Sequence, residues 1–373
     1  MNILHIFPDD KFFDSVSDTF DEIDMIHNTY LFYISDISYK FKYIKKTYKL
    51  KIVHDRKEYL NFFSNPSFDV VFFHSLPEYN YNLINYTDPG KIIIWWSWGF
   101  DIYDSEHGLK ALIPIDLYKP LTKNYIKQFR DSINMKFIRD LILKPFFLKK
   151  RGKAISRIDY YSPVLPIEYE LMKKNSFFHA KLFLPGGPSK ILKNIPLHNF
   201  TSNQNILIGN SATPSNNHLD ILNIIKDFSL KSRQVILPLS YGDQNYADFV
   251  KQYLPSHLNN VILQNFLTKE EYNSITDNCS HAIFGNIRQQ SLGNIHMCLR
   301  NGTKVYLFKD SLVYKQLTKN GYKIFTIEDD LTQESIDTPL PYEDAKHNHF
   351  LYTNKNGGAD YIANEFKKIK SPH

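Results

Sequence analysis

The chain has 373 residues, of which 43% are hydrophobic; this suits two globular domains and excludes a largely disordered protein. Its two cysteines, Cys279 and Cys298, exclude a disulfide framework and a zinc site built on paired cysteines, and they indicate a reducing cytoplasm. The net charge is +6, no apolar run approaches the length that spans a bilayer, and the N-terminus lacks a signal-peptide pattern.

The first half of the chain predicts a parallel α/β domain. Short apolar runs without strict alternation are typical of strands buried on both faces, and polar or helical segments separate these runs. We expect strands over residues 3–7, 30–34, 48–53, 70–74 and 92–96.

A basic stretch follows from residue 119 to residue 157. It holds twelve Lys or Arg against two acids, Asp131 and Asp140, with aromatic and aliphatic residues between them. This pattern suits an anionic membrane surface, and a solvated helix face over a domain core has the same pattern. No nucleic-acid-binding motif accompanies the charges, so we expect no nucleic-acid partner.

The second half repeats the alternation after a linker expected near residues 184–188. We expect strands over residues 206–208, 234–237, 261–264, 281–284 and 304–308, and helices over 218–228, 246–253, 269–278, 293–300 and 360–370. The chain therefore predicts two Rossmann-like domains that face each other across a cleft, with ligands beyond the carboxyl ends of the strands. The expected boundaries are 1–190, 200–350 and a helical tail over 351–373 that packs back on the first domain.

The strongest local motif follows the first strand of the second half. Gly209 ends the strand, a loop of small and polar residues follows, and a helix begins near Asn217 and His218. Gly209 permits close backbone approach, and Ser211 and the helix N-terminus offer donors to an anion. A plain N-cap at Asn217 is the competing reading. The loop matches neither the P-loop nor the dinucleotide motif, which disfavours an ATPase or an NAD enzyme.

A second motif covers residues 284–295, again between a strand and a helix. Arg288 suits a phosphate, Gln289 and Gln290 suit the hydroxyls or amide of a sugar, and Gly293 and Asn294 begin another helix. Two anion-ready helix ends in one half of the chain suggest a diphosphate between them.

A third motif, at residues 95–104, holds all three tryptophans and the acid Asp101. Trp98 suits stacking against a sugar ring, and Asp101 is a candidate general base, although a packed aromatic core and a helix cap are the alternatives. His5, Lys11 and His74 lie at other predicted strand ends of the first half, and we assign them to the same cleft.

Together these motifs resemble the acetamido-dideoxygalactose transferases of enterobacterial common antigen synthesis. The resemblance rests on Gly209-Asn210-Ser211, Ser215-Asn216-Asn217-His218, Pro238-Leu239-Ser240-Tyr241-Gly242, Arg288-Gln289-Gln290 and Trp98-Gly99-Phe100-Asp101-Ile102-Tyr103. It implies the GT-B fold, a dTDP-linked 4-acetamido-4,6-dideoxygalactose donor, an undecaprenyl-diphosphate-linked saccharide acceptor and peripheral attachment to the inner face of the inner membrane. It also implies that Asn210 and Tyr241 belong to the nucleotide site.

We therefore expect a glycosyltransferase with no cofactor besides its nucleotide-sugar co-substrate. No metal is expected, because the acidic pairs at Asp9 and Asp329 lack the spacing of a metal motif, while Arg and helix dipoles suit the leaving diphosphate. A nucleotide-sugar epimerase is one alternative, and a non-catalytic, membrane-associated glycan-binding protein is another.

Overall fold

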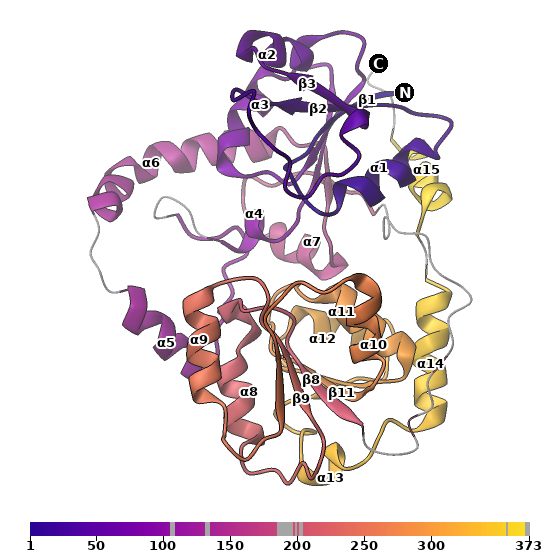
Figure 1. The fold of residues 1–373 in the computed structure, drawn as a ribbon. Helices are drawn as coiled ribbons and strands as arrows, with labels where there is room; N and C mark the ends of the chain where they lie inside the picture. The colour runs from indigo at the N-terminus through magenta and orange to yellow at the C-terminus, as the bar shows by residue number, and fades with distance from the viewer. Residues whose placement is uncertain are drawn as a thin grey trace. The chain divides into compact units, whose positions relative to one another are not determined.

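The chain forms two compact units (Figure 1). The computed structural model describes residues 1–104, 109–130, 135–184, 197, 200, 204–355 and 357–369, with backbone alone for residues 129, 130 and 135–142. Unit 1 comprises Met1–Pro114, Asn134–Ile191 and Asn356–His373, and unit 2 comprises Ile115–Ile133 and Leu192–Lys355. The expected linker lies outside the described residues from residue 185 onward.

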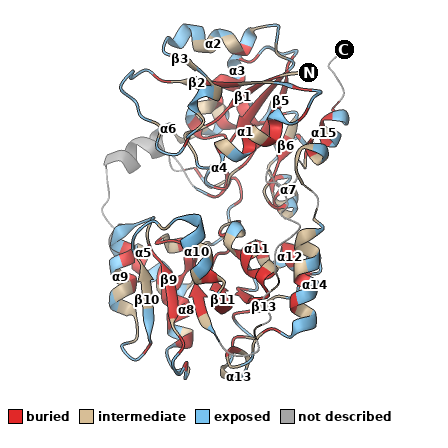
Figure 2. Cartoon of the chain, turned by 45° about the vertical axis from the view of Figure 1, so that its right-hand side comes forward, coloured by how far each residue is buried: buried red, intermediate tan, exposed pale blue. Residues whose placement is uncertain are grey.

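The described part of unit 1 contains a parallel seven-stranded sheet in the order β3-β2-β1-β4-β5-β6-β7. Its strands are β1 (Asn2–Ile6), β2 (His27–Tyr33), β3 (Leu50–Val53), β4 (Val70–His74), β5 (Ile92–Trp96), β6 (Tyr160–Ser162) and β7 (Lys181–Leu182). The helices of this unit are α1 (Phe13–Asp21), α2 (Arg56–Ser64), α3 (Tyr81–Tyr86), α4 (Phe100–Tyr103), α6 (Met135–Ser156), α7 (Pro166–Met172) and α15 (Ala359–Lys367). Every residue of β4 and of β5 is buried, as expected for strands covered on both faces. Figure 2 shows the buried strands of this sheet in red.

The described part of unit 2 contains a parallel six-stranded sheet in the order β10-β9-β8-β11-β12-β13. Its strands are β8 (Asn205–Ile208), β9 (Val235–Pro238), β10 (Asn260–Leu263), β11 (Cys279–Phe284), β12 (Lys304–Leu307) and β13 (Phe325–Thr326). Its helices are α5 (Pro120–Arg130), α8 (His218–Ile225), α9 (Gln244–Tyr253), α10 (Lys269–Thr276), α11 (Leu292–Asn301), α12 (Leu312–Lys319), α13 (Gln333–Ile336) and α14 (Tyr342–Thr353). Helices flank this sheet on both faces (Figure 1).

Residues 115–133 belong to unit 2, whereas the sequence placed them in the first domain. The physical reason is that α8, a helix of unit 2, caps the N-terminus of α5. The Asp220 carboxylate of α8 accepts hydrogen bonds from the backbone N–H of Leu121 at 2.9 Å and of Thr122 at 3.0 Å, and from the Thr122 hydroxyl at 2.7 Å. Asp220 thereby satisfies donors in the first turn of α5, which have no partner within their own helix.

The chain returns to unit 1 at its C-terminal end. Ile362 and Phe366 of α15 are buried against Phe20 of α1 and the face of the sheet. The basic stretch is divided between the units. Lys119, Lys123, Lys127 and Arg130 lie in unit 2, where Lys119 pairs with Asp310 at 2.9 Å, and the remaining described basic residues of the stretch lie mainly on α6 of unit 1. None of the helices in the described part of the chain is long and apolar enough to cross a membrane.

Candidate functional site

Unit 2 carries the two predicted loops at the switch point of its sheet. The strand order changes direction between β8 and β11, and ligands of such sheets bind beyond the carboxyl ends of the strands at that point. Gly209 follows β8 and Gly285 follows β11, so the loops 209–217 and 285–291 emerge from neighbouring strands. The two predicted motifs therefore lie side by side.

Both glycines are required by the packing of these loops. Gly209 has φ +65°, and a Cβ placed on it would lie 2.5 Å from Nε2 of His218. A Cβ on Gly285 would lie 2.1 Å from the carbonyl oxygen of Asn216. At both positions the backbone lies closer to its neighbours than a residue with a Cβ atom would permit.

Side chains then join the loops by hydrogen bonds. The Ser215 hydroxyl donates to Oε1 of Gln290 at 2.6 Å, and Nδ2 of Asn217 donates to the carbonyl of Gly285 at 2.7 Å. Within the second loop, Nδ2 of Asn286 donates to the carbonyl of Gln290 at 2.7 Å. Because these bonds fix the loops before any ligand binds, the region is preorganised.

Asn217 is fully occupied within the protein. It has a left-handed backbone (φ 51°) and no exposed surface. Its Oδ1 accepts the backbone N–H of Lys119 at 2.8 Å, and its Nδ2 also donates to the carbonyl of Leu117 at 3.1 Å. The sequence predicted a nucleotide contact here; the geometry instead makes Asn217 the tie that holds segment 117–119 against both loops.

His218 is buried behind Gly209 and does not reach the surface. Burial lowers its pKa to about 3, so the ring is neutral at physiological pH and adds no positive charge for a phosphate. Its backbone N–H donates to the Tyr246 hydroxyl at 3.1 Å. The His218 amide therefore already has a partner inside the fold, and the expected anion site at the start of α8 stays a prediction that does not include this amide.

The remaining predicted residues of unit 2 lie around the same loops. Arg288 is half-buried, and its guanidinium lies 3.4 Å from the carbonyl of Gln289. Gln289 is buried, and its Nε2 has no hydrogen-bond partner among the described residues. Gly293 is exposed in the first turn of α11, and the half-buried Asn294 follows it. Their ligand contacts remain predictions.

Asn210 and Tyr241 are linked across two neighbouring loops. Nδ2 of Asn210 donates to the Tyr241 hydroxyl at 3.0 Å, and Ser211 is buried beside them, its hydroxyl 3.0 Å from that of Thr213. Tyr241 remains 38% exposed. The loop after β9 thus extends the candidate site beyond the two motifs at the switch point.

In unit 1, Asp101 receives four hydrogen bonds. Its Oδ2 accepts from the backbone N–H of Leu76 at 2.9 Å and from Nε1 of Trp95 at 2.8 Å. Its Oδ1 accepts from the backbone N–H of Trp98 and of Gly99, both at 3.0 Å. Burial raises the pKa of the carboxyl, and these bonds oppose the increase. The carboxylate thus closes the turn after β5, but it does not cap α4, whose N-cap is Gly99 and has no side-chain cap hydrogen bond. A role of Asp101 as general base stays a prediction.

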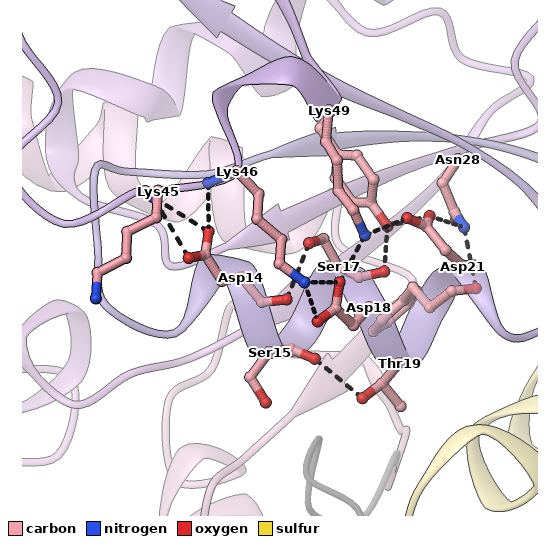
Figure 3. Close-up of polar contacts among 12 residues, drawn as sticks. Asp14, Ser15, Ser17, Asp18, Thr19, Asp21, Asn28, Lys45, Lys46 and Lys49 are labelled. Carbon is pink, nitrogen blue, oxygen red and sulfur yellow. Dashed lines mark hydrogen bonds and ion pairs between the residues drawn. The ribbon is translucent and has the colours of Figure 1, made fainter. Parts of the chain in front are cut away.

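His5 and His74 form a buried chain rather than a surface. Nδ1 of His5 lies 2.9 Å from Nε2 of His74, and Nε2 of His5 lies 2.9 Å from Oδ1 of Asn28. The Asn28 amide donates to Asp21 and to the carbonyl of Phe20, which fixes Oδ1 as an acceptor (Figure 3). His5 therefore carries its proton on Nε2 and His74 donates from Nε2. Both side chains are fully buried.

Asp21, which supports this chain through Asn28, and its α1 neighbour Asp18 also hold the β2–β3 connection. Lys49 pairs with Asp18 at 2.8 Å and with Asp21 at 2.6 Å, and Lys46 pairs with Asp18 at 2.5 Å (Figure 3). Lys11 and Trp98 lie at the edge of the region: Lys11 is exposed and Trp98 half-buried. Of the first-half residues assigned to the cleft, these two retain accessible side chains.

Comparison with known families identifies the chain. The model of the family described as 4-alpha-L-fucosyltransferase, glycosyl transferase group 56, matches residues 146–342, just over half of the chain. The chain belongs to this family. It is therefore a glycosyltransferase, and all of the unit 2 loops described above fall inside the matched residues, whereas His5, His74 and Asp101 fall outside them.

Solved structures of other proteins share the fold of this chain. Sucrose-phosphate synthase from Thermosynechococcus elongatus is 9% identical with TM-score 0.61, covering 99% of this chain and 98% of its own. A glycosyltransferase from Rickettsia africae is 12% identical with TM-score 0.59, covering 99% and 97%. At such identities the likeness establishes the fold alone, and it confirms the predicted GT-B class.

The sequence assigned no separate role to Gly285, and it placed Arg151 on a surface. Gly285 immediately follows a buried strand, as Gly209 does, and that shared position was a usable signal. Arg151 was counted among the membrane-facing charges, but it is 9% exposed and donates to the carbonyl of Lys110 at 2.7 Å.

Proposed function

We propose that this group 56 glycosyltransferase transfers a 4-acetamido-4,6-dideoxygalactose-type sugar from a dTDP-sugar to an undecaprenyl-diphosphate-linked saccharide in surface polysaccharide synthesis. The family description names a fucosyltransferase, and fucose is likewise a 6-deoxygalactose. The motif resemblance supports the acetamido sugar and the enterobacterial common antigen setting. A nucleotide-sugar donor and a glycan acceptor accord with this family.

The observation that carries the proposal is the pair of loops at the β8–β11 switch point. Neither stretch, 209–218 nor 284–295, contains an acidic residue, and the second contains Arg288 beside the N-terminus of α11. An anion there meets donors and a guanidinium without any opposing carboxylate in either loop. Such groups stabilise the charge that develops on a departing nucleoside diphosphate.

Calorimetry of dTDP binding tests the placement. Arg288→Ala should weaken binding by about 1.5–3 kcal/mol, the range for a hydrogen bond to a charged group. Arg300→Ala is the matched control, because it removes the same charge from the far end of α11. If the two variants bind dTDP equally well, the diphosphate does not lie at Arg288.

The reaction is tested by a donor screen read by mass spectrometry against a lipid-linked saccharide. Transfer from the dTDP-acetamido sugar, and not from other nucleotide sugars, is the expected result. Conversion of a free nucleotide sugar without acceptor would favour the epimerase. Donor binding without any turnover would favour a glycan-binding protein.

We also propose that α6 contacts the membrane that holds the acceptor. Phe146 is 64% exposed, and Leu143 and Leu148 are 40% and 41% exposed. Lys149 and Lys153 are exposed on the same helix, and one helical face carries both together with Phe146, three and seven residues apart. Apolar side chains flanked by lysines suit an anionic interface.

Vesicle sedimentation tests the membrane contact. Phe146→Ser combined with Lys149→Ser and Lys153→Ser should reduce binding to vesicles containing phosphatidylglycerol, most strongly at low salt. A control with Lys226→Ser and Lys269→Ser removes two exposed lysines from unit 2. Equal sedimentation of the α6 variant and the wild type would exclude α6 as the contact.

A further inference from the structure

Two exposed aromatic rings are stacked at the carboxyl edge of the unit 2 sheet. Tyr241 and Phe266 have ring centroids 5.8 Å apart and planes inclined by 17°. Phe266 is 74% exposed and Tyr241 38%. Single exposed aromatics are common, but a near-parallel pair at the ligand-binding edge of a Rossmann-like sheet presents a flat apolar surface where a planar ligand is expected.

The position of the pair relates to the proposed diphosphate loops. Tyr241 follows β9 and Phe266 follows β10, the two strands beyond β8 on the side away from β11. Neighbouring strands lie about 4.8 Å apart, so β10 is roughly 10 Å from β8. In dinucleotide-binding sheets of the same strand order, the pyrophosphate lies at the first strand and the ribose at the next strand on this side.

The Tyr241 ring is held rigidly against the loop that follows β8. The backbone N–H of Ala212 donates to the carbonyl of Tyr241 at 2.7 Å, and Asp243 N–H donates to the carbonyl of Ala212 at 3.0 Å. A Cβ on Gly242 would lie 2.7 Å from the carbonyl carbon of Ala212, so this close approach requires glycine. The bond from Asn210 to the Tyr241 hydroxyl adds a side-chain link.

We propose that the nucleobase of the donor lies against the Tyr241–Phe266 pair, so that this pair, and not the switch-point loops, recognises the base. The inference rests on the proposed nucleotide-sugar function and adds the residues that bind the base. A pyrimidine ring has an aromatic face for stacking, and the two-strand offset leaves room for the pentose between base and diphosphate. Base–aromatic stacking contributes about 1–3 kcal/mol by alanine substitution, which corresponds to roughly 5–150-fold in affinity.

The test compares dTDP with inorganic pyrophosphate, which has the diphosphate and no base. Phe266→Ala should weaken dTDP binding by roughly 5–150-fold and leave pyrophosphate binding unchanged. Phe266→Tyr, which keeps the aromatic face, should restore dTDP binding. Phe350→Ala is the matched control, because Phe350 is 60% exposed on α14 of the same unit.

The outcomes separate this inference from the function on which it rests. Equal dTDP affinity of Phe266→Ala and wild type overturns the inference, and so does an equal loss of dTDP and pyrophosphate, which would indicate a disturbed loop. Wild-type protein that binds neither probe overturns the proposed function as well. Because Phe266 is largely exposed, the variant should melt as the wild type does, and melting curves check this.

Discussion

Replacing Gly285 by alanine should disrupt the candidate donor site and destabilise unit 2. The added Cβ would lie 2.1 Å from the carbonyl oxygen of Asn216, where an ordinary contact begins near 3.4 Å, so the Asn216 backbone must move by roughly 1 Å. Overpacking of this kind costs about 1–3 kcal/mol. Loss of the Asn217–Gly285 hydrogen bond adds about 1–3 kcal/mol, since its polar groups are buried.

The sum of about 2–6 kcal/mol is large beside the stability of a typical domain, about 5–15 kcal/mol. Urea unfolding should show it, and calorimetry should show weaker dTDP binding. Gly293→Ala is the matched control for the unfolding measurement alone, because Gly293 is itself a predicted contact of the diphosphate. Its Cβ meets no atom within 4 Å, and alanine in a helix is favoured by about 0.5–1 kcal/mol. If Gly285→Ala unfolds at the wild-type urea concentration and binds dTDP normally, the packing argument is refuted.

Three further substitutions have defined outcomes. Asp101→Asn should lower the free energy of unfolding of unit 1 by about 1–3 kcal/mol in urea, because an amide nitrogen would face two of the four N–H donors. Unchanged stability with a kcat reduced about 10²–10⁴-fold would instead identify a general base. Burial raises the pKa of Glu168 to about 7 from 4.5, so its protonated form stabilises unit 1 below pH 4.5 and this contribution is lost as the pH rises through 7. Relative to Glu168→Gln, the wild type should lose about 3 kcal/mol of unfolding free energy between pH 4.5 and pH 8, and parallel pH profiles would contradict this. Asn217→Asp places a carboxylate against the carbonyls of Leu117 and Gly285 and should lower the urea midpoint of unit 2, whereas an unchanged midpoint would show that these ties contribute little.

The sequence identified the sheet strands where local composition determines them. Runs such as Val70–His74 and Ile92–Trp96 are apolar throughout because both faces are covered, and both strands occur as predicted. The strands missed were β6, β7 and β13, which have three, two and two residues and lie toward sheet edges, where no apolar run is needed.

The candidate site was predictable in its loops and not in its side chains. Small residues after a strand marked loop 209–217, because such residues permit close backbone approach. Asn217 faces inward because it bonds to Gly285, which lies 68 residues further along the chain. His218 follows Asn217 and lies behind Gly209. Local sequence carries no trace of such a tertiary contact.

The same strand order occurs in both units, yet their switch points differ in what they can bind. In unit 1 the Phe7 ring stacks on His74 with centroids 3.5 Å apart, and Asp9 and Asp10 follow β1. Burial alone would raise the pKa of Asp9, but backbone N–H donors, that of Lys42 at 2.7 Å among them, lower it, so the carboxylate is ionised. A diphosphate at that position would be repelled by the negative charge of Asp9, whereas neither loop of unit 2 contains an acidic residue. This difference in charge supports the proposal that unit 2 binds the nucleotide. The exposed Lys11 and half-buried Trp98 of unit 1 stay predicted contacts of the acceptor sugar.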